Sequence, residues 1–208
     1  MQFEFPSAVI QVFCKAPIAG QVKTRLMPEL SAEQAAVVHR QLSLRTLALV
    51  SAAKLCAVQL WCAPSAQHPF FIQAARDYAL SLQTQSSGDL GERMAIALRS
   101  GLESYQYAVL MGCDCPSFTR DDLVQALTAL KNGPEVVLAP TEDGGYSLIG
   151  LKRPQPALFK GISWSSAKVF AETQRKIKAL KLNSVTLRTQ WDVDTYADYL
   201  RFIDKDNG

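Results

Sequence analysis

The sequence predicts a three-layer α/β/α sandwich with a mostly parallel central sheet. Short runs of β-branched and apolar residues, such as AVIQVFC over 8–14 and YAVLMG over 107–112, alternate with longer stretches that have the apolar spacing of helices. Strands that alternate with helices pair in parallel, because each crossover returns the chain to the same end of the sheet. The 208 residues contain no internal repeat and no linker, so we expect a single domain over 1–208.

Capping and turn residues separate the elements of the first half of the chain. The strand over 8–14 leads into a loop over 15–30 that is rich in glycine, proline and basic residues. Ser31 is placed to cap a helix that runs to about residue 51. We expect a strand over 55–62, a short helix after the loop over 64–69, and a strand over 78–83. Gly88 begins a turn over 88–92 that opens a helix reaching Leu102.

The second half continues the alternation of strands and helices. The run over 107–112 is the clearest buried strand, and Thr119 caps a helix over 121–131 with acids in its first turn, as the helix dipole favours. Extended segments are expected over 135–139 and 146–151. A helix from near Ser165 to about residue 182, a strand over 185–187 and a last helix from Thr195 complete the prediction.

Composition argues against several classes of protein. A net charge of +3 gives no reason to expect a nucleic-acid partner. No run approaches the roughly 20 apolar residues of a membrane span, and the first residues lack the basic segment of a signal peptide, so we expect a cytoplasmic protein. Five cysteines with no C-x-x-C pair are typical of reduced thiols, and no zinc site is expected. Two histidines without obvious partners make a Ser-His-Asp or Cys-His mechanism a poor fit.

A basic loop follows the first strand, where α/β proteins bind their ligands. It contains Lys15, Gly20, Lys23 and Arg25. Cations and backbone N–H groups in such a loop can hold phosphates, so we predict a nucleotide-binding role for these four residues. The spacing matches neither G-x-x-x-x-G-K-[ST] nor G-x-G-x-x-G. The alternative is a basic loop that only faces water.

Aspartates follow the central strand and precede the last helix. Asp114 comes directly after the strand over 107–112, and Asp192 and Asp194 lie on the same side of an extended stretch. Carboxylate oxygens suit a hard divalent cation such as Mg²⁺, which takes only one or two protein ligands beside a phosphate. We predict that Asp114 and Asp194 bind the metal, although the sequence does not decide between Asp192 and Asp194. The alternatives are a turn at Asp114 and a helix cap at Asp194 or Thr195.

Two further segments are candidates for binding a second substrate. In Asp143-Gly144-Gly145-Tyr146 the paired glycines allow the backbone to approach a ligand closely, and the alternative is a simple Asp-Gly hairpin turn. Trp164 could stack on a ligand, and the alternative is a core tryptophan.

Asp89 and Arg93 open the helix that follows Gly88. The guanidinium of Arg93 could reach a phosphate or a base edge, so both residues are candidates for nucleotide binding. The alternative is an ion pair between these two side chains, one turn apart on the helix.

Taken together, six segments resemble a known family. In order they are FCKAPIAGQVKTRL, GDLGERM, GCDCP, APTEDGGYSLIGL, WS and DVDT. This order, from about Val9 to about Asp198, resembles the DUF2064 group of bacterial glycosyltransferase-A-like proteins. The resemblance implies a nucleotide-diphospho-sugar transferase fold, and an aspartate after a central strand that holds Mg²⁺ or Mn²⁺ against a diphosphate. Asp114 stands at the matching position.

The resemblance implies one of two chemistries. Gly112 and Pro116 flank Asp114 where a D-x-D motif would need an acid, which weakens glycosyl transfer from a nucleotide sugar. The stretch from Lys23 to Leu26 resembles a triphosphate-gripping loop, which favours nucleotidyl transfer from a nucleoside triphosphate to a phosphorylated small-molecule acceptor.

For nucleotidyl transfer we expect Lys23 and Arg25 to stabilise the phosphates and Asp143 to contact the acceptor. For glycosyl transfer, Asp143 would be the base for an acceptor hydroxyl. A nucleotide-binding protein without catalysis is the third possibility. The sequence does not define the base, the sugar, the acceptor or the oligomeric state.

Overall fold

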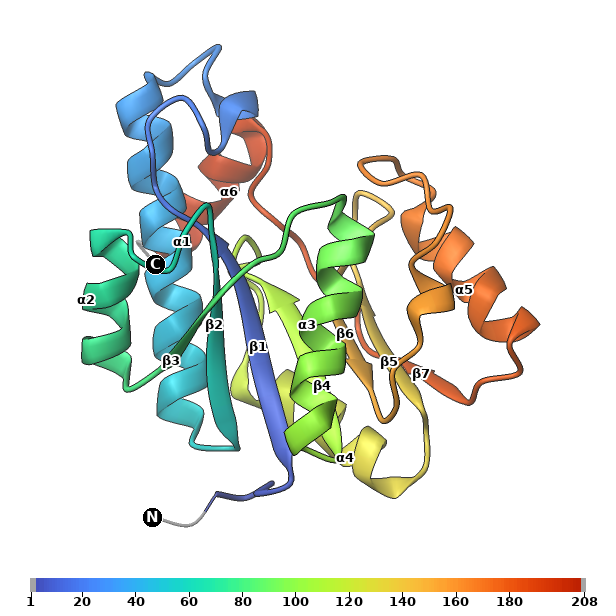
Figure 1. The fold of residues 1–208 in the computed structure, drawn as a ribbon. Helices are drawn as coiled ribbons and strands as arrows, with labels where there is room; N and C mark the ends of the chain where they lie inside the picture. The colour runs from blue at the N-terminus through green and yellow to red at the C-terminus, as the bar shows by residue number, and fades with distance from the viewer. Residues whose placement is uncertain (1–2, 207–208) are drawn as a thin grey trace.

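A seven-stranded sheet forms the centre of the computed structural model, which describes residues 3–206 (Figure 1). Along the chain the strands are β1 (Ala8–Lys15), β2 (Ala57–Ala63), β3 (Ser81–Thr84), β4 (Tyr107–Gly112), β5 (Val136–Pro140), β6 (Tyr146–Leu151) and β7 (Ser184–Thr186). Their order in the sheet is β3-β2-β1-β4-β6-β5-β7. Strand β6 runs antiparallel to both of its neighbours, and the other strands share one direction. The predicted mostly parallel sheet is confirmed.

Helices cover both faces of the sheet, which confirms the three layers. They are α1 (Ala32–Ala53), α2 (Pro69–Tyr78), α3 (Leu90–Ser104), α4 (Arg120–Asn132), α5 (Val169–Ala179) and α6 (Tyr196–Asp206). Strand β1 shows how the layers form. Ile10 and Val12 pack into the core beneath α1, α2 and α4, whereas Val9 packs on the other face with α3 and α5. Alternate residues of a strand point to opposite faces, so one buried strand contributes to both cores.

Capping residues fix where the helices begin. Ser31 and Thr119 cap α1 and α4 as predicted, and the structure shows that each forms a capping box. Helix α3 begins at Leu90, inside the turn expected over 88–92, with Asp89 as its cap. The prediction that α5 starts near Ser165 is wrong, because Ser165 has a positive φ of 66° and the chain forms a loop there before entering the helix at Val169.

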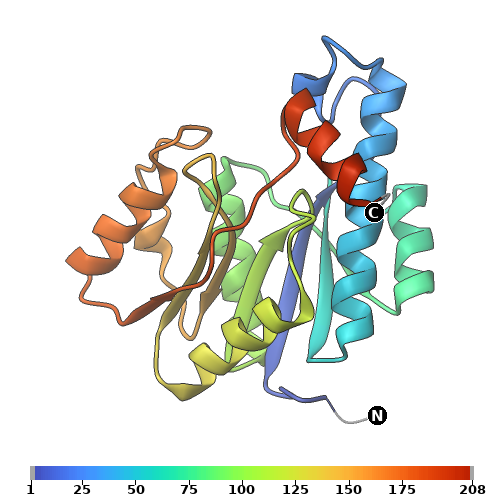
Figure 2. The same cartoon turned by 180° about the vertical axis from the view of Figure 1, so that it is seen from behind.

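A third cluster of buried side chains joins the two ends of the chain. It contains Leu42 of α1, Phe202 of α6, and both Trp191 and Val193 of the segment that leads into α6. Figure 2 shows α6 lying beside α1, with this segment running across the near side of the molecule from β7 to α6. Among residues 3–206, no helix combines the length and the apolarity that crossing a membrane requires.

Candidate functional site

Three segments that carry predicted site residues meet at one edge of the sheet. Strands β1 and β4 are parallel neighbours, with Phe13 opposite Gly112, so the basic loop and the Asp114 loop begin side by side. The backbone N–H of Val193 donates to the carbonyl of Asp114 at 3.0 Å, which brings the segment before α6 to the same place. This edge is where the carboxyl ends of the parallel strands lie, as expected for a ligand site in this class of fold.

Asp114 has two partners on one side, the Lys23 ammonium and the His39 ring. The Lys23 ammonium lies 2.6 Å from Asp114 Oδ1, and His39 Nδ1 lies 3.6 Å from the same oxygen. Oδ1 is buried and accepts no well-aligned hydrogen bond, while 44% of the whole side chain is exposed. Burial alone would raise the pKa of Asp114, but Lys23 and His39 hold it well below its usual range. Asp114 is therefore ionised, and Oδ2 is the oxygen that it can offer to a ligand.

Lys23 is almost completely buried, with 6% of its side chain exposed. Burial would lower the pKa of this ammonium, but the Asp114 carboxylate raises it above its usual value. The backbone of Lys23 is in the left-handed region, at φ 49°, where it begins a short 3₁₀ turn over Thr24–Leu26. In this conformation its charge faces Asp114. A direct phosphate contact, as the sequence predicts, would require Lys23 to leave this partner.

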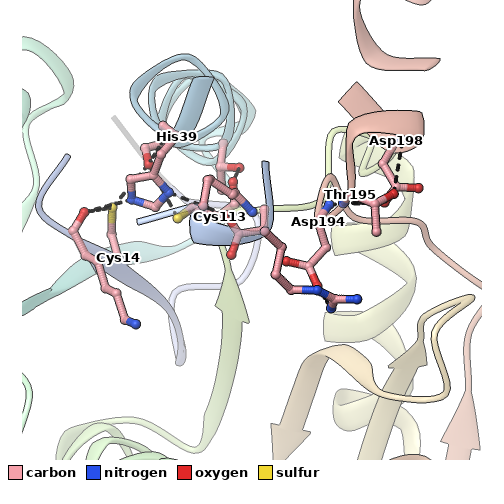
Figure 3. Close-up of polar contacts among 12 residues, drawn as sticks. Cys14, His39, Cys113, Asp194, Thr195 and Asp198 are labelled. Atoms are coloured by element: carbon pink, nitrogen blue, oxygen red, sulfur yellow. Dashed lines mark hydrogen bonds and ion pairs between the residues drawn. The ribbon is translucent and has the colours of Figure 1, made fainter. Parts of the chain in front are cut away.

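His39 is a residue of this site that the sequence interpretation missed. It comes from α1, and its Nε2 lies 2.9 Å from the carbonyl of Lys15, so Nε2 carries a hydrogen and donates it. The ligating atoms of His39, Cys14 and Cys113 lie within 4.8 Å of one another, and this is the group of three metal-ligating side chains found within residues 3–206. Figure 3 shows the three together. Sulfur and imidazole suit zinc better than magnesium.

The two aspartates before α6 have different partners. Burial alternates along the segment, so Asp192 and Asp194 project away from the core that holds Trp191 and Val193. Asp194 forms an ion pair with Arg25. The helix cap expected at Asp194 or Thr195 belongs to Thr195, whose hydroxyl accepts from the Asp198 backbone N–H at 3.4 Å (Figure 3). The Asp194 carboxylate is therefore not used as the helix cap, and its partner is Arg25.

Asp192 faces other acids. Burial, together with the charge of Asp143, raises the pKa of Asp192 to about 6. Lys23 lies within electrostatic reach of both Asp114 and Asp194. Four carboxylates therefore surround two cations, Lys23 and Arg25, at this edge. The carboxylates outnumber the cations here, and Asp114 is partly exposed. Such a set of oxygen ligands fits a hard divalent cation such as Mg²⁺ or Mn²⁺.

The remaining nucleotide-binding candidates lie at the ends of β1 and α3. Lys15 is exposed at the end of β1, and Gly20 has a φ of 77° with open space beside it. Arg93 donates to Gln85 Oε1 at 3.0 Å, and Gln85 in turn contacts the Trp61 carbonyl at 2.8 Å. Arg93 is thus brought toward the same edge, but it is not paired with the Asp89 carboxylate.

The Asp89 side chain binds the first turn of α3. Its Oδ1 accepts from the Glu92 backbone N–H at 2.8 Å, and the Glu92 side chain accepts from the Asp89 N–H at 3.0 Å. The Asp89 side chain therefore serves as the N-cap of α3, and its predicted contact with a nucleotide stays a prediction.

The predicted acceptor segment forms the turn between β5 and β6. Asp143 Oδ1 accepts from the Thr141 hydroxyl at 2.5 Å and from the Gly145 N–H at 3.0 Å, so the hairpin alternative describes its local structure. Gly144 has a φ of 88°, and a Cβ there would lie 2.3 Å from the Ala167 carbonyl. Only glycine fits that position. The turn leaves Asp143 exposed toward Asp192.

Trp164 lies beside this turn. Its ring is edge-on to Tyr146, with 6.5 Å between the ring centroids. A Cβ on Gly91 would lie 2.7 Å from the indole, so Trp164 packs closely on the start of α3. The packing against Gly91 and Tyr146 gives Trp164 a structural role. The indole is also partly exposed, so part of its surface could stack on a ligand.

Comparison with known proteins places these features in a family context. The family described as an uncharacterized protein conserved in bacteria, DUF2064, matches residues 46–166. A crystal structure from Desulfovibrio desulfuricans G20, provisionally assigned as a nucleotide-diphospho-sugar transferase, is 28% identical over 97% of this chain and 88% of that one, with a TM-score of 0.85. No curated protein matches the chain.

Two more distant structures share the fold. The 4-diphosphocytidyl-2C-methyl-D-erythritol synthase of Anaerococcus prevotii DSM 20548 has a TM-score of 0.66 at 9% identity, over 97% of this chain and all of the other. CMP:2-keto-3-deoxy-manno-octonic acid synthetase, in complex with CTP, has a TM-score of 0.57 at 12% identity over the same shares. At these identities the likeness shows the fold alone.

Proposed function

The chain belongs to the DUF2064 family, and we propose that it is a metal-dependent nucleotidyltransferase, which moves a nucleotide from a nucleoside triphosphate onto a phosphorylated small-molecule acceptor. One observation carries this proposal. The ionised Asp114, the segment with Asp192 and Asp194, and the basic loop with Arg25 meet where β1 and β4 end. They are far apart in the sequence, and a nucleotide phosphate with a divalent cation needs both kinds of charge in one place.

The basic loop would bind the phosphates. Arg25 has 68% of its side chain exposed and Lys15 is also exposed, so both can reach a triphosphate from solvent. Lys23 would keep its ion pair with Asp114 and add its positive charge to the site. An arginine can donate two parallel hydrogen bonds to phosphate oxygens, which gives Arg25 the larger part in orientation.

The carboxylates would hold the cation. Asp114 and Asp194 are the proposed ligands, with Asp192 beside them. The cation, Mg²⁺ or Mn²⁺, would neutralise the phosphates and stabilise the departing pyrophosphate. The attacking group of a phosphorylated acceptor is already an anion, so the chain needs to supply no general base, and its residues bind and orient the two substrates.

The acceptor would lie against the β5–β6 turn. Asp143 is exposed there, and Gly144 and Gly145 are partly exposed beside it. Trp164 offers a partly exposed ring on the neighbouring loop. Turn and loop are held together, since the Phe170 N–H donates to the Gly144 carbonyl at 3.0 Å. These contacts support a preformed acceptor surface next to the carboxylates.

Glycosyl transfer is the second candidate, because the Desulfovibrio desulfuricans structure at 28% identity carries a nucleotide-diphospho-sugar transferase assignment. In that reaction the same carboxylates would hold a cation on the departing nucleoside diphosphate, and Asp143 would take the proton of an acceptor hydroxyl. Beside it, burial and the charge of Asp143 raise the pKa of Asp192, which would favour proton uptake at Asp192.

Thermal protection distinguishes the two reactions. We would measure the melting temperature of the wild type, Arg25→Ala, and the matched control Arg76→Ala, which removes an exposed arginine on α2. Each is tested with nucleoside triphosphates and with nucleotide sugars, in Mn²⁺. Nucleotidyl transfer predicts that a triphosphate protects more than the corresponding nucleotide sugar. Arg25→Ala should remove that difference, and Arg76→Ala should keep it.

Other outcomes would change the proposal. Stronger protection by a nucleotide sugar than by any triphosphate would favour glycosyl transfer. Protection by triphosphates without release of pyrophosphate, over a panel of phosphorylated acceptors, would favour a nucleotide-binding protein without catalysis. No protection by either class of nucleotide would refute the proposed site.

A further inference from the structure

A cluster of two thiols and an imidazole lies beside the carboxylate site. Its members are Cys14 near the end of β1, His39 of α1, and Cys113, which directly follows β4 (Figure 3). All three side chains are buried, and one ligating atom from each lies within 4.8 Å of the others. The three residues are far apart along the chain, and the parallel pairing of β1 with β4 brings the two cysteines to one place.

The His39 ring is oriented as in a metal-binding histidine. Nε2 donates its hydrogen to the Lys15 carbonyl at 2.9 Å, which leaves Nδ1 as the ligand atom. A histidine bound to a metal almost always donates its other ring N–H to a carbonyl or a carboxylate, which fixes the ring. Nδ1 lies 3.6 Å from Asp114 Oδ1. This separation is too long for a hydrogen bond, but it is close to the ~3.3 Å between two ligand atoms that each lie about 2.0 Å from a tetrahedral zinc.

The two sulfurs share a hydroxyl group as their neighbour. Ser43 Oγ lies 3.3 Å from Cys14 Sγ and 3.4 Å from Cys113 Sγ. Ser43 follows His39 by one turn of α1, so one face of the helix presents both the ring and the hydroxyl to the sulfurs. Neighbouring ligand atoms of a tetrahedral zinc are about 3.3–3.8 Å apart, so side-chain movements of about 1 Å or less would close the cluster on the ion.

Asp114 supplies a fourth ligand and balances the charge. Its Oδ1 is buried and accepts no well-aligned hydrogen bond. A divalent metal displaces one proton from each thiol, so two thiolates and the Asp114 carboxylate would offset the cation and the Lys23 ammonium. The Asp114 side chain is 44% exposed, so an ion can enter from the carboxylate site. Oδ2 remains for the hard cation of the proposed function.

We propose that Cys14, His39, Cys113 and Asp114 form a structural zinc site, which joins the ends of β1 and β4 to α1. Thiolate and imidazole ligands select zinc, whereas Mg²⁺ and Mn²⁺ prefer sites made of oxygen atoms. The zinc position therefore shares only Asp114 with the proposed site of the hard cation. The inference does not rest on nucleotidyl transfer, because a structural zinc stabilises the fold whatever reaction the chain performs.

The test uses the full chain, reduced and freed of metal, in excess Mg²⁺ to occupy the carboxylates. Zn²⁺ is titrated against a chromophoric chelator, and Co²⁺ serves as a spectroscopic probe. The proposal predicts one Zn²⁺ per chain, a higher melting temperature with Zn²⁺, and a sulfur-to-cobalt charge-transfer band that oxygen ligands do not give. Cys113→Ser should weaken Zn²⁺ binding at least tenfold and reduce the band. Cys56→Ser is the matched control, because Cys56 is buried in the same core, and it should behave like the wild type.

Two further results separate the zinc site from the carboxylates. Asp194→Ala removes a proposed ligand of the hard cation, so it should keep the cobalt band. Cobalt binding by the wild type without the band would place the metal on the carboxylates and overturn the proposal, even if a cysteine variant fails to fold. Wild-type Zn²⁺ affinity in folded Cys113→Ser would overturn it as well. Either result would leave Mn²⁺-dependent triphosphate binding, and with it the proposed function, intact.

Discussion

Replacing Asp114 by asparagine should destabilise the protein through Lys23. The Lys23 side chain is 6% exposed, and its ammonium lies 2.6 Å from the carboxylate that Asp114→Asn removes. Breaking a buried ion pair by removing one partner costs about 3–5 kcal/mol, because the other charge is left buried. Solvent reaches Asp114, which is 44% exposed, and screens part of this effect, so we expect about 2–3 kcal/mol. For a chain of this size, that lowers the melting temperature by about 4–12 °C.

Urea unfolding of four proteins tests this reasoning: wild type, Asp114→Asn, Lys23→Met and the double variant. Lys23→Met leaves a carboxylate that water and His39 still reach, so it should cost less than Asp114→Asn. The double variant removes the unpaired ammonium and should be more stable than Asp114→Asn alone. Strictly additive losses in the double variant would show that the pair does not interact. A loss under about 0.5 kcal/mol in Asp114→Asn would contradict the burial of Lys23 against it.

Three further predictions concern other parts of the site and its surroundings. Arg188→Gln leaves Asp122, whose side chain is 2% exposed, without its ion pair, so urea unfolding should show a loss of about 2–3 kcal/mol, against less than about 1 kcal/mol for Arg120→Gln. The pKa of Asp192 is raised to about 6, so its carboxylate lowers the free energy of unfolding as pH rises from about 4 to above 6. Asp192→Asn should therefore stabilise by about 1–2 kcal/mol at pH 8 and by nothing at pH 4, and an equal effect at both values would contradict the raised pKa. Gly144→Ala places a Cβ 2.3 Å from the Ala167 carbonyl at a φ of 88°, so the melting temperature should fall, whereas Gly20→Ala, at φ 77° in open space, should cost less.

Local patterns were sufficient to predict most of the fold. The run Tyr107–Gly112 is a strand with the predicted bounds, and Ser31 and Thr119 cap α1 and α4, because these signals depend on neighbours in the sequence. The start of α5 was predicted wrongly near Ser165. Its polar residues imitate a cap, but a loop packed against the β5–β6 turn occupies that position.

The site depends on contacts that no local pattern contains. The sequence placed Asp114 at the end of a strand. The structure adds that Oδ1 of this carboxylate is buried against Lys23 and His39. His39 had no visible partner in the sequence, because Lys15 and Asp114 come from two adjacent strands and reach it only in the folded sheet. Cysteines at the ends of strands β1 and β4 were the one available signal for the Cys14–His39–Cys113 group.

Calorimetry of nucleoside triphosphate binding, with Mn²⁺ and then with EDTA, tests the central claim most directly. A triphosphate beside the carboxylates of Asp114, Asp192 and Asp194 is repelled unless a cation lies between them. We therefore predict binding of a triphosphate in Mn²⁺, a loss of at least tenfold in affinity in EDTA, and a similar loss in Asp114→Ala with Mn²⁺ present. Folding of the variant is checked by circular dichroism in the same buffer. Equal affinity with and without metal, or wild-type affinity in folded Asp114→Ala, would contradict a metal-dependent nucleotide site at Asp114.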